Sequence, residues 1–129
     1  MGGEGIQSYR DLLVWQKAMG LSVLCYELTK NFPKDETYGM IAQIRRASVS
    51  IPANIAEGHG REHTRSFVQF LRVAQGSLKE LETHVLLAER VGLVHSDTLA
   101  GIHSHTDEIG RMLRALIRSL QGKLGDADA

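Results

Sequence analysis

The 129-residue sequence contains a single cysteine, two prolines and few aromatic residues, which make up 5% of the chain. Because Cys25 has no second cysteine, the chain can form neither an intrachain disulfide nor a cysteine metal cage. No stretch approaches the roughly 18 consecutive apolar residues of a membrane helix, and residues 1–6 lack the features of a signal peptide. We therefore expect a cytoplasmic protein with no membrane contact, in which Cys25 is an inert core thiol.

The sequence also lacks an excess of charge of either sign. Fifteen Lys and Arg residues balance fifteen Asp and Glu residues, so the formal net charge is zero. This balance disfavours a strongly electrostatic nucleic-acid binder but is compatible with a local basic patch. The hydrophobic fraction of 43% is ordinary for a folded protein, and the length fits one domain over residues 1–129.

Apolar residues recur with helical spacing in four segments, and no segment shows the alternation of a strand. The pattern predicts helices over about residues 9–30, 37–57, 64–91 and 96–121, with Ser8 and Asp11 as a capping box before the first. Because the connections are short, neighbouring helices should be antiparallel. The sequence therefore predicts an all-α, up-down-up-down four-helix bundle. The predicted apolar seam of its fourth helix consists of Leu99, Ile102, Thr106, Ile109, Leu113, Leu116 and Leu120.

Three features should disturb these helices. Pro52 deprives the Ser48 carbonyl of its usual partner, so we expect a kink near Ser50, with a full break as the alternative. Gly76 lies mid-helix, where glycine costs about 1 kcal/mol relative to alanine, so another backbone should approach closely there. Residues 122–129 are expected to form a frayed tail.

Polar residues run beside the isoleucine face of the second predicted helix and have counterparts on the third. Because an unpaired buried polar group costs about 1–3 kcal/mol, we expect them to satisfy one another, with Arg46 and either Glu57 or Glu80 as the charged members. The alternative is a subunit-contact or ligand surface. The predicted structural polar network consists of Arg46, Ser50, Asn54, Glu57, Ser77 and Glu80.

Basic residues form rows on the third and fourth predicted helices, and such rows can contact phosphates. The alternative is a solvated face. The candidate nucleic-acid-binding residues are Arg61, Arg65, Arg72, Lys79, Arg111, Arg114 and Arg118. Trp15 lies off the apolar seam of the first predicted helix and is a candidate oligomer contact, with a satellite core position as the alternative.

Residues His59 to His63 match the H-x-x-E-H pattern of inverted zinc proteases. That chemistry needs a rigid helix, whereas this string falls at a predicted turn between glycines, so we interpret it as a solvated polar loop. The sequence has neither a nucleophile-elbow motif nor a glycine-rich phosphate loop. We therefore predict a protein that is not an enzyme, with no catalytic residue, metal, cofactor or small-molecule substrate.

The string from Gln43 to Gly58, QIRRASVSIPANIAEG, followed by Arg61, resembles the signature of a bacterial four-helix-bundle family. Its members are also called 23S ribosomal RNA intervening-sequence proteins. The run from Gly76 to Glu82 agrees with this resemblance, which covers about residues 9–120.

The resemblance implies a partner as well as a fold. Relatives of the family include the accessory variability proteins of diversity-generating retroelements, which form homopentameric rings and assist a reverse transcriptase by binding its RNA. By resemblance we expect a homopentamer. The leading expectation is an oligomeric helical-bundle interaction protein in an RNA or reverse-transcriptase complex. The alternative is a protein that binds structured RNA directly, through the basic rows of its third and fourth helices.

Overall fold

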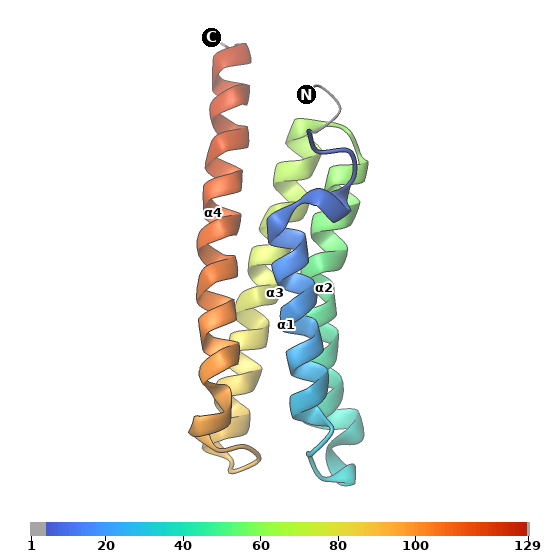
Figure 1. Cartoon of the computed structure of the whole chain (residues 1–129), viewed down its shortest axis with the longest axis vertical. Coiled ribbons are helices and arrows are strands. Elements are labelled where there is room, and N and C mark those ends of the chain that lie inside the picture. Colours follow the sequence, from blue (N-terminus) through green and yellow to red (C-terminus); the bar gives the residue numbers. More distant parts are fainter. Residues whose placement is uncertain (1–4, 129) are drawn as a thin grey trace.

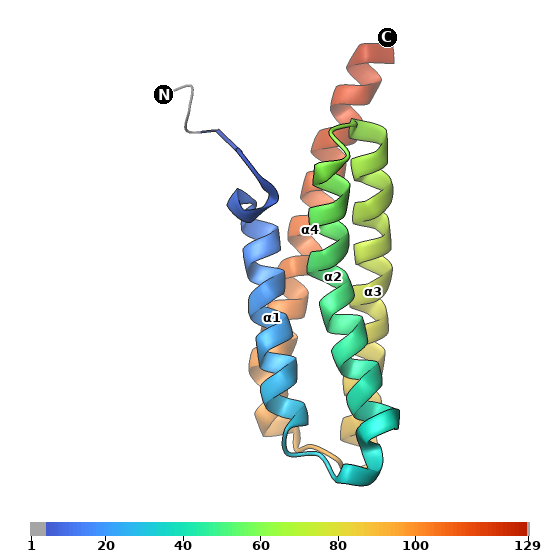
Figure 2. The same ribbon diagram turned by 90° about the vertical axis from the view of Figure 1, so that its right-hand side faces the viewer.

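A computed structural model describes residues 5–128 and shows four long helices and no strand within that range (Figure 1). The helices are α1 (Leu13–Thr29), α2 (Ala42–Gly60), α3 (Thr64–Arg90) and α4 (Ala100–Asp128). Figures 1 and 2 show each helix running opposite to the one before it, with both described ends of the chain at the same end of the molecule. The predicted all-α four-helix bundle is thus confirmed. Within the described residues, none of the helices has the length and apolar character needed to cross a membrane.

All four helices contribute to one apolar core. Each presents a stripe of fully buried side chains, for example Leu21, Ile51, Leu81 and Ile109, all at 0% exposure. Burial of these stripes provides most of the stability, because isolated helices of this length are marginal in water.

The predicted seam of α4 is fully buried up to Leu113, and its last two residues pack at the edge of the core. Ile117 is the buried residue of the next turn, whereas Leu116 and Leu120 are only partly buried. Because a straight helix has 3.6 residues per turn, heptad positions drift by about 20° per heptad. In the third heptad Leu116 therefore lies at the edge of the buried stripe, and Ile117 fills it.

The first helix begins later than predicted. Ser8 and Asp11 form the predicted capping box, but it caps a short 3₁₀ turn, Tyr9–Asp11. Asp11 accepts hydrogen bonds from the backbone N–H groups of Gln7 at 2.9 Å and Ser8 at 3.1 Å. These bonds lower the pKa of its carboxyl group. Leu12 is extended, and α1 starts at Leu13.

The second helix also begins late, and it is longer than predicted at its other end. A 3₁₀ turn (Lys34–Glu36) and a π-helical turn (Thr37–Ile41) precede it, and Gly39 interrupts the helical path with φ −101° and ψ −111°. α2 then runs from Ala42 through Pro52 to Gly60, so the alternative of a full break is wrong. The carbonyl that Pro52 leaves without a partner, that of Ser48, accepts a hydrogen bond from Ser22 Oγ of α1 at 2.9 Å.

The expectation of a frayed tail after residue 121 is wrong. After a 3₁₀ turn (Ser96–Leu99), α4 continues to Asp128 and projects beyond the other helices (Figures 1 and 2). Glycines at 122 and 125 cost only about 1 kcal/mol each relative to alanine. Leu124 is partly buried and offsets some of that cost. Ala129 lies outside the described residues.

The close approach expected at Gly76 occurs at Gly58 instead. Gly76 is exposed, and a Cβ atom placed on it would meet nothing within 4 Å. A Cβ atom on the buried Gly58 would lie 2.6 Å from the Cβ atom of Phe70. Gly58 therefore allows α2 and α3 to pack closely near their connection, whereas Gly76 faces open space.

Candidate functional site

Three of the six residues predicted to form a polar network meet between α2 and α3. Ser50 Oγ lies 2.7 Å from Ser77 Oγ, so one hydroxyl donates to the other. Asn54 donates from Nδ2 to the Ser50 carbonyl oxygen at 2.8 Å and to Ser50 Oγ at 3.1 Å. These partly buried groups satisfy one another, as a structural network requires.

The three charged residues predicted for that network do not join it. Glu57 forms an ion pair with Arg61 at 3.0 Å, and Glu80 lies 3.5 Å from the ring of His84. Arg46 is exposed and has neither a hydrogen bond nor an ion pair among the described residues. All of these charges lie at the rim of the helix pair, where water solvates them, so they have no need to pair across the helices.

The two basic rows, in contrast, converge on one groove between α3 and α4. Its central hollow, of about 390 Å³, lies between Arg72 and Lys79 of α3 and Arg114 of α4. Gly76 and Gly110 line the same hollow and leave it open, because neither carries a side chain. A second hollow shares Arg72 and reaches Arg65, and a third shares Lys79 and Arg114 and reaches Arg111. We call these three hollows together the α3–α4 groove.

The α3–α4 groove is predominantly positive. Arg72, Arg111 and Arg114 are exposed and form no ion pair among the described residues. Lys79 is paired with Glu82 at 3.2 Å, and Glu82 and Asp107 place negative charge only at the third hollow.

Two of the candidate nucleic-acid-binding residues, Arg118 and Arg61, do not line the α3–α4 groove. Arg118 follows Arg114 by four residues and is exposed on the same side of α4. Arg61 lies outside the groove, because its guanidinium pairs with Glu57 and stacks over the ring of Phe70, 5.1 Å from the ring centroid.

The outward surface of α1 is unusually apolar, and the sequence-based search for sites missed it. Its exposed side chains include Leu13 (57%), Met19 (42%), Val23 (58%) and Tyr26 (40%), which we call the α1 face. The described part of α4 exposes no large hydrophobic side chain. A signal was present in the sequence, since the 17 residues of α1 contain only two charged ones.

Trp15 borders the α1 face. Its side chain is partly buried against the core and meets the ring of Tyr9 edge to face, with the centroids 5.1 Å apart.

Comparison with known proteins decides the family. A model of the family described as 23S rRNA-intervening sequence protein matches residues 10–115. The chain belongs to this family. A search of curated proteins finds no match. A crystal structure of a protein of unknown function from the S23 ribosomal protein family of Bacteroides thetaiotaomicron superposes with a TM-score of 0.73. It is 25% identical in sequence, and the match covers 81% of this chain and 98% of that one.

This member of the 23S rRNA-intervening sequence family has its single thiol in the core. Cys25 is fully buried, and burial raises the pKa of its thiol to about 12. The thiolate form that acts as a nucleophile or a metal ligand is therefore scarce at neutral pH.

The H-x-x-E-H string is split between the end of α2 and the turn that follows. His59 lies in the last turn of the helix and meets the ring of Phe67 edge to face, whereas Glu62 has φ 56° and His63 caps α3. The string is therefore not on one helix, as zinc-protease chemistry requires. No group of three or more His, Cys, Asp or Glu residues in the described part of the chain could hold a metal ion.

Proposed function

We propose that this chain is a self-assembling helical bundle that acts as an interaction module in RNA-associated complexes rather than as an enzyme. The observation that carries the proposal is the α1 face. Leu13, Met19, Val23 and Tyr26 are each at least 40% exposed on one helix, which is typical of an interaction site rather than of a solvated surface.

The composition of α1 supports a buried environment for this helix. A helix that is apolar on all sides is normally enclosed by protein, and α1 has only Lys17 and Glu27 as charged residues. Lys17 pairs with Glu108 of α4 at 3.5 Å, so it is turned away from the centre of the α1 face. A further copy of the chain is the proposed cover. Family resemblance favours a ring of five copies, in which each α1 face meets its neighbour.

The assembly is tested by light scattering coupled to gel filtration at micromolar protein concentration. Val23→Glu places a charge at a 58% exposed position in the α1 face and should reduce the mass toward 14.3 kDa, that of one chain. Val91→Glu is the matched control, since Val91 is 60% exposed but lies beyond the end of α3. A wild-type protein that runs as a monomer would refute the proposal, as would equal masses for the wild type and Val23→Glu.

The α3–α4 groove supports a second candidate function, direct binding of structured RNA. Arg72, Lys79 and Arg114 from two helices surround one hollow, so their charges can act on the same phosphate backbone. No aromatic residue lines the groove, so it lacks the stacking platforms with which proteins hold single strands. We therefore propose the backbone of an RNA duplex as the ligand.

Binding of a hairpin RNA with a long double-stranded stem, measured by fluorescence anisotropy, tests this function. Each lost phosphate contact should weaken binding and reduce the slope of log affinity against log salt by about 1. Arg72→Glu and Arg114→Glu should therefore weaken binding at least tenfold. Arg46→Glu, an exposed and unpaired position on α2, is the charge-matched control and should change binding little. Equal losses in all three variants would indicate only a general charge effect and would contradict the assignment of this groove.

A further inference from the structure

A further hollow lies at the end of the bundle where α1 finishes and α4 begins. It has a volume of about 440 Å³, within the range of pockets that hold small ligands. Leu24 and Leu28 of α1, Phe32 after it, and Ile102 of α4 form much of its apolar wall. Polar side chains of Glu27, Asn31, His95 and Thr98 also line it, so the wall is apolar with one carboxylate and a few neutral polar groups.

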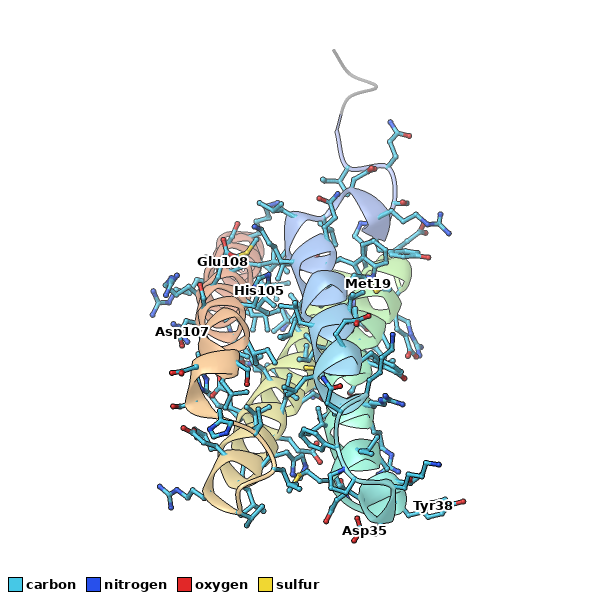
Figure 3. All side chains as sticks on the ribbon, turned by 60° about the horizontal axis from the view of Figure 1, so that its bottom comes forward. Met19, Asp35, Tyr38, His105, Asp107 and Glu108 are labelled. Carbon is cyan, nitrogen blue, oxygen red and sulfur yellow. The ribbon has the colours of Figure 1, made fainter. Side chains whose placement is uncertain are left out.

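Tyr38, at the same end of the bundle, is the most exposed large hydrophobic residue described. It is 95% exposed, and Figure 3 shows its side chain pointing away from the helices. The turn that carries it is structured: the backbone N–H of Met40 donates to Glu36 Oε1 at 3.1 Å. Tyr38 is therefore an aromatic side chain that a structured turn presents to solvent with almost no cover from its own chain.

The hollow and Tyr38 complement each other chemically. An aromatic ring gains from burial against leucine and phenylalanine, and a phenol hydroxyl needs a hydrogen-bonding partner once it is buried. The amide of Asn31 and the ring of His95 can both provide one.

One chain cannot bring its own Tyr38 into its own hollow. The hollow opens between α1 and α4, whereas the turn with Tyr38 precedes α2 and lies on the other side of α1 from α4 (Figures 1 and 3). A contact of this kind between copies is head to tail, because each copy offers the side chain on one side and the hollow on another. Head-to-tail contacts generate closed rings when the rotation between copies closes.

We propose that Tyr38 of one copy inserts into the hollow between α1 and α4 of the next copy and sets the head-to-tail direction of the assembly. This inference rests on the self-assembly proposed above. Leu24 and Leu28, which line the hollow, belong to the same helix as the α1 face.

Two variants remove the two halves of the contact separately. Tyr38→Ala removes the inserted side chain. Gly101→Phe fills the hollow, because Gly101 lines it and a Cβ atom there would meet nothing within 4 Å, so the fold should tolerate the change. Each variant should dissociate at a concentration at least tenfold higher than the wild type. Gly122→Phe is the matched control, an equally open glycine on the same helix but far from the hollow.

Mixing the two variants gives the decisive measurement. Tyr38→Ala retains an open hollow and Gly101→Phe retains Tyr38, so an equimolar mixture should form a one-to-one dimer of two 14.3 kDa chains that neither variant forms alone. A mixture that stays dissociated would overturn the head-to-tail assignment.

The outcomes also separate this inference from the proposed self-assembly. If both variants retain the wild-type mass while Val23→Glu dissociates, the insertion of Tyr38 is wrong and self-assembly through the α1 face stands. If the wild type is itself monomeric, both proposals fail.

Discussion

The two sides of α3 are built differently. Toward α2, the helices are in close contact at Gly58 and are joined by the hydrogen bond between Ser50 and Ser77. Toward α4, Gly76 and Gly110 line a hollow of about 390 Å³ with basic side chains around it. Glycine on the first side permits tight packing, and on the second it keeps a groove open. The bundle is therefore closely packed where α3 meets α2 and open to solvent where α3 meets α4.

The strongest test of the close packing between α2 and α3 is Gly58→Ala. The new Cβ atom would lie 2.6 Å from the Cβ atom of Phe70 and 3.1 Å from Cδ1 of Phe67. The Cβ atom of Phe70 is bonded directly to the backbone of α3 and cannot rotate away. The backbones of α2 and α3 must therefore move apart. We expect the free energy of unfolding to fall by about 2–3 kcal/mol, in the upper part of the range for overpacked cores.

Chemical denaturation monitored by circular dichroism measures this loss. Gly60→Ala is the matched control, since Gly60 lies two residues further along α2 and nothing is within 4 Å of its Cβ position. Alanine at 60 should leave stability equal or slightly higher. An equal loss at both positions would show that the end of α2, rather than its contact with α3, is sensitive.

The hydrogen bond between α1 and α2 can be tested by a double-mutant cycle. Ser22 Oγ donates to the Ser48 carbonyl at 2.9 Å because Pro52 cannot do so. Ser22→Ala should therefore cost about 1.5 kcal/mol in the wild type, since the buried carbonyl loses its partner. In the Pro52→Ala background, the new backbone N–H of residue 52 can donate to the Ser48 carbonyl oxygen. Ser22→Ala should then lower the free energy of unfolding by less than half as much. Equal costs in both backgrounds would contradict this account of Ser22.

Burial of Cys25 predicts that stability declines at alkaline pH. The pKa of its thiol is raised from 9.0 to about 12 in the folded protein. Below pH 9 the thiol is protonated in both states. Above pH 9 the unfolded chain loses the proton first, so the folded state is progressively disfavoured until about pH 12. At pH 10 this amounts to about 1.4 kcal/mol.

The comparison needed is the loss of unfolding free energy between pH 7 and pH 10 in the wild type and in Cys25→Ala. Subtracting the two removes the contributions of lysines and tyrosines, which both proteins share. Between pH 7 and pH 10, the free energy of unfolding should fall further in the wild type than in Cys25→Ala. The same loss in Cys25→Ala would mean that burial does not raise the pKa of the Cys25 thiol, because water reaches it in the folded protein.

Helical periodicity was sufficient to predict the fold. The four apolar stripes and the short connections specify which faces are buried, and the capping box at Ser8 and Asp11 was found from residue types alone. The helix starts were less predictable. Non-helical backbone angles at Leu12 and Gly39 delay the starts of α1 and α2. The spacing of apolar residues does not reveal such angles.

The surfaces depend on how the helices are placed around one another. The sequence gives two separate basic rows, and only the packing of α4 beside α3 brings Arg72 and Arg114 to one hollow. Likewise, the α1 face follows from the absence of any element covering the outer side of α1. Pairings within the polar stripe were predicted in part, because Ser50 and Asn54 are one turn apart, whereas Arg46 could reach solvent instead.

The close approach expected at Gly76 is the prediction that the fold contradicts most clearly. A substitution there also has the smallest expected effect on the free energy of unfolding. The position of this glycine in mid-helix predicts a close neighbour, yet a Cβ atom placed on it would meet nothing within 4 Å. Gly76→Ala should therefore raise the free energy of unfolding by about 0.5–1 kcal/mol, because alanine restricts the unfolded chain and favours the helix. Since alanine adds one methyl group to the hollow between Arg72 and Arg114, affinity for hairpin RNA should change by less than threefold. A loss of stability would mean that another backbone does reach Gly76, as in an assembly that covers the α3–α4 groove, and that groove could then not bind RNA in the assembled protein.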